Sequence, residues 1–90
     1  MELSYNEAKR HWTLIHRGLD FADAGQIFDD AHFTQEDDRY DYPELRYQTY
    51  GRINGRLVMI AWTPISRGIR VISMRKCNDR EQKAFATRLG

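Results

Sequence analysis

Positively charged side chains run through and beyond an apolar segment near the C-terminus, residues 69–82, with the sequence IRVISMRKCNDREQ. Arg70 and Arg75 interrupt a stretch that reads as a strand, and Lys76 and Arg80 follow it. A guanidinium group stays charged and presents a planar fork that fits two phosphate oxygens. Cations in and after this strand therefore point to recognition of a phosphodiester.

Alternation along this strand assigns its side chains to the two faces of a sheet. Arg70, Ile72 and Met74 share one face, and we expect the two apolar residues to lie against helices. Ser73 and Arg75 then lie on the uncovered face, near the end of the strand. A hydroxyl and a guanidinium group in this position would suit a phosphate.

Further candidates come from the segments that precede this strand. Thr63 ends one predicted strand, Arg67 lies in the turn after it, and Arg46 lies at the start of the strand before. These residues join the open face only if the sheet curves or is narrow. Metal-free RNA cleavage needs such groups, because donors must stabilise the charge that grows on the phosphate when the 2′-hydroxyl attacks it. An arginine-bearing open sheet fits a solvated face or a protein interface equally well, and these alternatives stay open.

The elements that position these residues form one domain spanning residues 1–90, since a second domain would leave neither half a core. The expected order is a helix at 4–18, a helix at 20–30, an edge strand at 32–36, an acidic loop at 37–44, a hairpin at 45–63, a strand at 69–75 and a helix at 78–89. This order predicts an α+β fold: two N-terminal helices, an antiparallel sheet of three to four strands and a C-terminal helix.

Local signals support these assignments. Asn54-Gly55 between two β-rich runs is the preferred two-residue type I′ turn. Asn78 and Glu81 have the spacing of a reciprocal helix cap. In the first helix, one apolar stripe is expected to be buried and consists of Ala8, Trp12, Ile15 and, past the turn, Leu19. In the second helix, the expected buried face consists of Phe21, Ala24, Ile27 and Phe28.

Charge is distributed unevenly along the chain. Residues 1–45 hold 11 Asp and Glu against 4 Lys and Arg, a net charge of −7, and residues 46–90 hold 10 basic against 2 acidic residues, a net charge of +8. The basic half would suit a polyanion, or the two halves neutralise each other within one fold. The apolar run at 57–62 is too short to span a membrane, and the chain opens without an export signal. Cys77 is the single cysteine, which fits a reducing cytoplasm.

Other chemistries find less support, and we expect no metal ion and no cofactor. His11, His16 and His32 lack the spacing of metal ligands. The acidic cluster at 36–44 could bind a divalent ion or be a solvated loop, because it lacks the glycine and final glutamate of a calcium loop. Cys77 beside two cations could be a reactive thiol or a small residue at the end of a strand.

Three segments, at residues 6–28, 36–64 and above all 70–82, resemble the BrnT toxins of bacterial type II toxin–antitoxin systems. The resemblance extends from residue 5 to about residue 85. It implies a fold like that of RelE-type ribonuclease toxins and RNA cleavage without metal that arrests translation. It also implies a ribbon-helix-helix (BrnA-like) antitoxin, which would bind the toxin and, with it, operator DNA.

The resemblance assigns roles residue by residue. The basic residues before the glycine of the helix turn match His16 and Arg17, the hydroxyl at the strand end matches Thr63, and the arginine that closes the last strand matches Arg75 with Lys76. His16 could assist proton transfer, or its charged form could simply favour the helix dipole. The RNA-binding set that we expect beside these catalytic candidates is Arg17, Arg46, Arg70, Ser73 and Arg80.

One position departs from the pattern. Relatives often show Thr-Pro-Arg where this chain has Thr63-Pro64-Ile65. If that arginine contributes to catalysis, Arg67 must substitute for it or activity is reduced. The partners expected from the resemblance are RNA and an antitoxin dimer in a hetero-oligomer, with no membrane. The alternative function is a non-catalytic protein-binding module or a co-repressor that acts with a DNA-binding partner.

Overall fold

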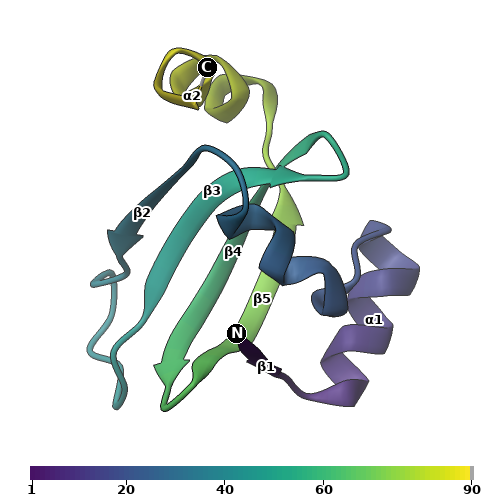
Figure 1. The fold of residues 1–90 in the computed structure, drawn as a ribbon, viewed down its shortest axis with the longest axis vertical. Helices are drawn as coiled ribbons and strands as arrows, with labels where there is room; N and C mark the ends of the chain where they lie inside the picture. Colours follow the sequence, from purple (N-terminus) through teal and green to yellow (C-terminus); the bar gives the residue numbers. More distant parts are fainter. Residues whose placement is uncertain (90) are drawn as a thin grey trace.

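A computed structural model describes residues 1–89 as a mixed five-stranded sheet with helices on both faces (Figure 1). The elements are β1 (Glu2–Ser4), α1 (Glu7–Arg17), the 3-10 helix η1 (Phe21–Phe28), β2 (His32–Glu36), β3 (Tyr47–Ile53), β4 (Arg56–Ile65), β5 (Gly68–Lys76) and α2 (Asp79–Leu89). The strand order is β1-β5-β4-β3-β2. The predicted α+β class is confirmed, with three helical segments and the predicted edge strand at residues 32–36.

The strand count and sheet type differ from the prediction. The first residues form β1, which pairs in parallel with the start of β5, so that Glu2 lies beside Gly68 and Ser4 beside Arg70. Three residues carry too little periodicity to reveal a strand, and a parallel partner far along the chain leaves no local turn signal. The sheet therefore has five strands rather than three to four, and it is mixed rather than antiparallel.

The β3–β4 hairpin forms as its sequence predicts. Asn54 and Gly55 have φ angles of 51° and 78°, which are the left-handed values of a type I′ turn. From this turn the strands pair in register from Ile53 with Arg56 to Tyr47 with Trp62. The hairpin fixes which residues of β3 and β4 share each face of the sheet.

The first core lies between η1 and one face of the sheet. Asp20 caps η1 by accepting a hydrogen bond from the backbone N–H of Ala22. The side chains of Phe21, Ala24 and Ile27 are fully buried, as the sequence predicted. Their partners on the sheet include the buried residues Ile53, Val58, Ile60, Ile69, Val71 and Met74.

A β-bulge in β5 changes the predicted alternation. Ala61 pairs with Ser73 but Trp62 pairs with Val71, so Ile72 is the extra residue. Val71 and Met74 consequently both face η1, and Ile72 packs on the other side of the sheet. The assignment of Ile72 to the face with Met74 is wrong, because simple alternation cannot anticipate an inserted residue.

Helix α2 crosses the other face and covers one end of it (Figure 1). Asn78 and Glu81 form the predicted reciprocal cap: Asn78 Oδ1 accepts from the Glu81 N–H at 2.8 Å, and the Asn78 N–H donates to Glu81 Oε1 at 3.0 Å. A second core joins Phe85 and Leu89 to buried sheet residues that include Tyr50 and Met59. The rest of this face is left open.

Helix α1 stands at the edge of the molecule beside β5 (Figure 1). Asn6 caps it by accepting from the Lys9 N–H at 3.0 Å, and Gly18 ends it with a φ of 66°. The buried residue of α1 is Thr13. The expected burial of the apolar stripe is correct for Leu19 but wrong for Ala8, Trp12 and Ile15, which are exposed.

Candidate functional site

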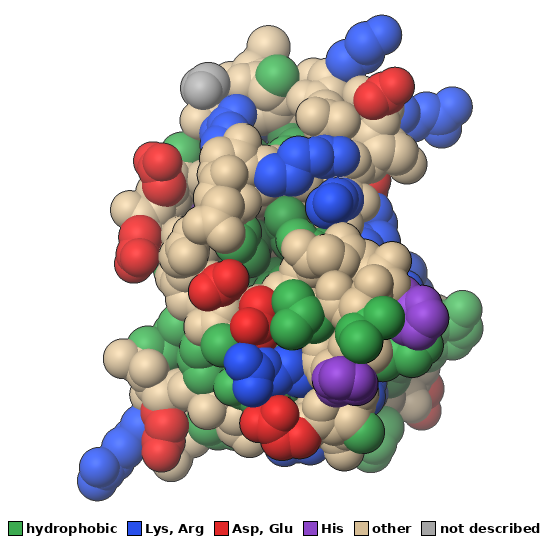
Figure 2. Space-filling model, turned by 90° about the vertical axis from the view of Figure 1, so that its right-hand side faces the viewer, with side chains coloured by type: hydrophobic (Ala, Val, Ile, Leu, Met, Phe, Trp, Pro, Cys, Tyr) green, Lys and Arg blue, Asp and Glu red, His purple; other side chains and the backbone are tan. Residues whose placement is uncertain are grey.

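A groove runs between α1 and the open face of β5. It consists of two adjoining hollows of about 220 and 370 Å³ that share Lys9 and Ile72 in their walls. Figure 2 views the molecule from the side of α1 and shows Lys and Arg side chains gathered above exposed hydrophobic and histidine side chains. We call this feature the α1–β5 groove, and its principal lining residues are Lys9, Trp12, Arg17, Arg46, Thr63, Arg70, Ile72 and Ser73.

The groove brings together half of the ten residues predicted as site residues. These five are Arg17, Arg46, Thr63, Arg70 and Ser73. Because of the bulge, Arg70 and Ser73 project from the same face of β5, and Thr63 pairs with Arg70 on the neighbouring strand. The groove thus joins cations and hydroxyl groups from two strands, a loop and a helix, which is the combination that a phosphodiester backbone requires.

Four of these five side chains are already held by contacts within the chain: those of Arg17, Arg46, Thr63 and Arg70. Arg17 Nη1 donates to the Met74 carbonyl at 2.7 Å, and its guanidinium carbon lies 5.2 Å from the centre of the Trp12 ring. Thr63 Oγ1 donates to the Leu45 carbonyl at 2.6 Å. These contacts fix the side chains in place, so a bound strand would meet preorganised groups.

The two remaining arginines of the groove are held by different kinds of contact. Arg70 Nη1 donates to Ser4 Oγ at 3.1 Å, and its side chain is exposed. Arg46 Nε donates to Glu44 Oε1 at 2.7 Å, and its guanidinium carbon lies 4.0 Å from the centre of the Tyr42 ring. An exposed arginine held by a neutral hydroxyl keeps its charge available, whereas the Glu44 carboxylate offsets the charge of Arg46.

Arg75 lies on the same face, two residues beyond Ser73, but points to α2. Its Nη1 and Nη2 atoms donate to the two carboxylate oxygens of Glu81 at 2.7 and 2.8 Å. This fork lowers the pKa of Glu81 to about 2, with help from the Asn78 N–H. The Glu81 hydrogen bond in turn raises the pKa of Arg75. The Arg75 side chain remains 39% exposed, so one side of the guanidinium can still meet a ligand.

The Arg75–Glu81 pair makes stability sensitive to acid. The pKa of Glu81 is about 2 in the folded protein and 4.5 in the unfolded chain. The ionised carboxylate therefore makes its full contribution to the free energy of unfolding above pH 4.5 and loses it as pH falls through 2. We expect Glu81→Gln to unfold at lower urea concentration than wild type at pH 5, with a difference that shrinks towards pH 2. Urea titrations at both pH values would measure this, and a constant difference would contradict it.

The other predicted site residues lie outside the groove. Lys76 projects on the opposite side of β5, with its Nζ near Gly18. Arg67 lies in the turn at the far end of β5 from Arg75, and Arg80 is exposed in the first turn of α2. His16 is exposed, and its ring centre lies 4.6 Å from that of Trp12, at the rim of the groove.

Sequence reasoning missed three residues of this region: Lys9, Trp12 and Glu81. Lys9 and Trp12 line the groove from one turn of α1, three residues apart. That spacing was visible, but Trp12 was assigned to a buried stripe. Glu81 was recognised as a cap, and nothing in its spacing from Arg75 revealed that it would also bind the guanidinium group.

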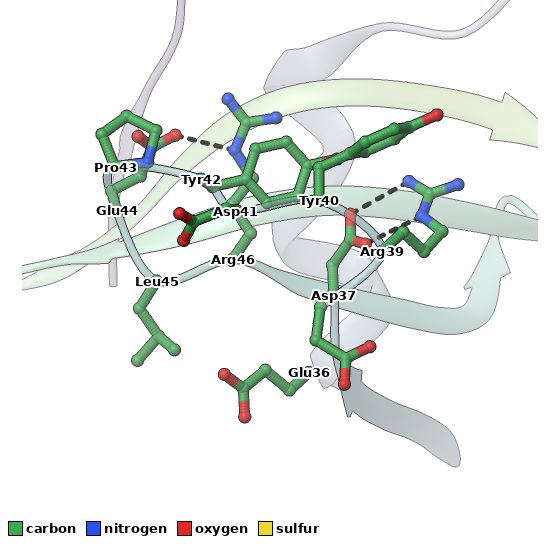
Figure 3. Close-up of a pocket in the computed structure, with 11 residues that line it drawn as sticks. Glu36, Asp37, Arg39, Tyr40, Asp41, Tyr42, Pro43, Glu44, Leu45 and Arg46 are labelled. Carbon is green, nitrogen blue, oxygen red and sulfur yellow. Dashed lines mark hydrogen bonds and ion pairs between the residues drawn. The ribbon is translucent and has the colours of Figure 1, made fainter.

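The acidic loop at residues 36–46 surrounds a separate hollow of about 590 Å³ (Figure 3). Asp37 is buried, and Arg39 donates to both of its oxygens at 2.8 and 3.0 Å, which holds the pKa of Asp37 below its usual range. Figure 3 shows a second ion pair in the loop, between Glu44 and Arg46. Among residues 1–89, no three His, Cys, Asp or Glu side chains are grouped as a metal site would require. Two of the five carboxylates in residues 36–46 are thus paired, and the loop keeps a net charge of −3.

Cys77 follows β5 and is buried in the second core. Burial raises the pKa of its thiol to about 11. A thiol with this pKa is protonated at neutral pH, whereas the nucleophile in cysteine chemistry is the thiolate. The geometry therefore supports a packing role for Cys77.

Comparison with protein families shows which family the chain belongs to. The family described as "Ribonuclease toxin, BrnT, of type II toxin-antitoxin system" matches residues 5–81. The chain belongs to this family. A BrnT toxin is the ribonuclease component of a type II system, so an antitoxin is its partner. No curated protein gave a significant match. Within residues 1–89, every helix is too short or too polar to cross a membrane.

Proposed function

We propose that this BrnT chain is a metal-independent endoribonuclease that binds its RNA strand in the α1–β5 groove and arrests translation in the cytoplasm. The observation that carries the proposal is that Arg17 and Ser73 line one hollow of the groove, and Arg46, Thr63 and Arg70 line the adjoining one. Arg75 lies on the same face, outside the groove lining, and the N–H groups that Glu81 leaves free would donate to the phosphate in the transition state. Metal independence is supported by this donor set, because guanidinium groups can supply the charge stabilisation that cleavage needs.

The groove supports an electrostatic mechanism. Arg70 and Arg46 would bind the phosphates on either side of the cleaved bond, and Ser73 would donate to a phosphate oxygen. Thr63 Oγ1 donates its proton to the Leu45 carbonyl, so it would accept a hydrogen bond from a ribose hydroxyl. Trp12 at the wall offers an aromatic surface for a base, as single-stranded RNA often requires. His16 at the rim is the proposed proton-transfer group, since its imidazole is exposed beside Trp12. Lys76, Arg67 and Arg80 would act at most on the more distant parts of the RNA.

The test begins with the purified chain, separated from antitoxin and incubated with single-stranded RNA in EDTA. Specific fragments should accumulate, because no step requires a metal ion. RNA that stays intact in EDTA but is cut when Mg²⁺ is added would overturn metal independence. RNA that stays intact in both conditions, beside a ribonuclease that cuts it, would overturn the nuclease assignment for this chain.

Arg70→Ala tests the groove itself. This substitution removes one contact to a phosphate of single-stranded RNA. A plot of the logarithm of the RNA association constant against the logarithm of the salt concentration should therefore become shallower by about 0.7 in slope. Lys83→Ala is the matched control, because Lys83 is exposed on α2 and lies outside the groove lining. A titration of labelled RNA at several salt concentrations measures both slopes. Equal slopes for Arg70→Ala and wild type would place the RNA elsewhere.

A second candidate function is a non-catalytic module or co-repressor. The internal contacts of Arg17, Arg46 and Arg75 favour it, because guanidinium groups engaged within the chain have fewer donors left for RNA. In either case we propose a ribbon-helix-helix antitoxin whose dimer binds the operator, so that the hetero-oligomer contains two or more copies of this chain. Growth arrest on expression, abolished by Arg75→Ala, would separate the nuclease from the module.

A further inference from the structure

The apolar stripe of α1 faces away from the body of the protein. Of the large hydrophobic side chains exposed within residues 1–89, three lie on this helix of 11 residues: Trp12, Leu14 and Ile15, which are 49%, 44% and 63% exposed. Successive residues of an α-helix are turned by about 100°, so Ile15 lies about 160° from the buried Thr13. We call the exposed stripe of Ala8, Trp12 and Ile15 the α1 ridge.

A helix that folds with its apolar face outward leaves that face for a partner. Exposed single hydrophobic residues are common, but an apolar stripe at regular helical spacing is typical of an interaction site. The ridge also adjoins the α1–β5 groove, because Trp12 belongs to both. An occupant of the ridge would therefore lie against the mouth of the groove.

The charges beside the ridge indicate the chemistry of the occupant. Lys9 and Arg17 lie towards the groove, and His11 and His16 flank the ridge. The acidic residue of α1, Glu7, pairs with Arg10 at 3.4 Å. A second copy of this chain would bring like charges together, which disfavours self-association. Of the three ridge residues, Trp12 alone offers a surface for base stacking, so the ridge suits an apolar protein segment better than RNA.

We propose that the α1 ridge is the docking surface for the antitoxin, which contributes an apolar segment flanked by carboxylates. Apolar side chains of the antitoxin cover Ile15 and Trp12, and the carboxylates pair with Lys9 and Arg17. The bound segment overhangs the groove and keeps RNA out. This last step rests on the proposed function, whereas the docking itself rests only on the exposed ridge and its charges.

Ile15→Glu tests the docking. The cognate antitoxin is co-expressed with the chain, purified, and titrated onto wild type and variant by calorimetry. A carboxylate in the centre of an apolar contact with acidic flanks should weaken binding by about 30-fold or more. Ala86→Glu is the control, because Ala86 is exposed on α2 and gains the same charge. Ile15→Glu with wild-type affinity would overturn the proposal.

Three further measurements distinguish the other occupants of the ridge and test the proposed function separately. Sedimentation without antitoxin should give a monomer for wild type, and a dimer that Ile15→Glu dissociates would assign the ridge to self-association instead. RNA affinity that falls in Ile15→Glu while antitoxin affinity is unchanged would assign it to RNA instead. Antitoxin should inhibit RNA cleavage by wild type far more than by Ile15→Glu. The calorimetry contains no RNA, so the docking is tested even if the chain cuts none.

Discussion

Arg75→Ala should slow RNA cleavage by about 10²- to 10³-fold, which is the usual loss when one preorganised donor is removed from a developing anion. Arg75 lies roughly 7 Å along β5 from Ser73 on the same face, given a rise of about 3.3 Å per residue. Glu81 holds its guanidinium group in one orientation through two hydrogen bonds. The rate of fragment formation at saturating RNA, measured for wild type and variant, gives the effect.

Two companion variants separate chemistry from folding. Arg75→Lys keeps the charge but loses the bidentate fork, so we expect it to restore little of the rate. Glu81→Gln removes the ion pair but leaves Arg75, so cleavage should fall less than in Arg75→Ala even though α2 loses the same contact. Equal rates for Arg75→Ala and Glu81→Gln would show that Arg75 acts only by holding α2. Circular dichroism confirms that each variant is folded.

Gly51→Ala should lower the free energy of unfolding by about 1–3 kcal/mol, the range for overpacking of a tight core. A Cβ atom at this position would lie 2.6 Å from Ile27 Cγ1, 3.1 Å from the Ile27 carbonyl oxygen and 3.2 Å from His32 Cβ. Ile27 is fully buried between η1 and the sheet and has no free direction in which to move. For a domain of this size the melting temperature should fall by about 4–8 °C for each kcal/mol.

Gly25→Ala provides the control for Gly51→Ala. Its added Cβ would meet only Met1 Cε, at the ordinary contact distance of 3.8 Å. Both variants add one methyl group, and alanine is itself favoured over glycine within η1, so the difference between their melting temperatures combines the clash at Gly51 with this helical preference. If Gly51→Ala and Gly25→Ala had the same melting temperature, the packing of η1 on β3 would be looser than the contacts of Ile27 indicate.

The elements that could be predicted from the sequence are those with a local signal. The type I′ turn at Asn54-Gly55 and the reciprocal cap of Asn78 and Glu81 depend on neighbouring residues, and both appear as expected. The buried face of η1 also followed from its own spacing. The parallel pairing of β1 depends on a contact between Glu2 and Gly68, for which the sequence carries no local sign.

The candidate site was predictable in its residue types and less so in its geometry. Ser73 was expected on the open face, and Arg46 and Thr63 were expected to join it only if the sheet curved or was narrow. All three line the groove. Lys76 was expected to act beside Arg75, but adjacent residues of a strand point to opposite faces. The stripe of α1 was expected to be buried, since a sequence shows that a helix has an apolar face but not whether that face is covered within the chain.

The bulge at Ile72 determines on which side of the sheet the arginines of β5 lie. Five positions separate Arg70 from Arg75, and an odd interval in a regular strand would direct the two guanidinium groups to opposite sides of the sheet. The additional residue makes the interval effectively even, so both cations are presented on one side. Loss of a single codon here would therefore leave the length of the strand almost unchanged and yet divide the cationic surface in two.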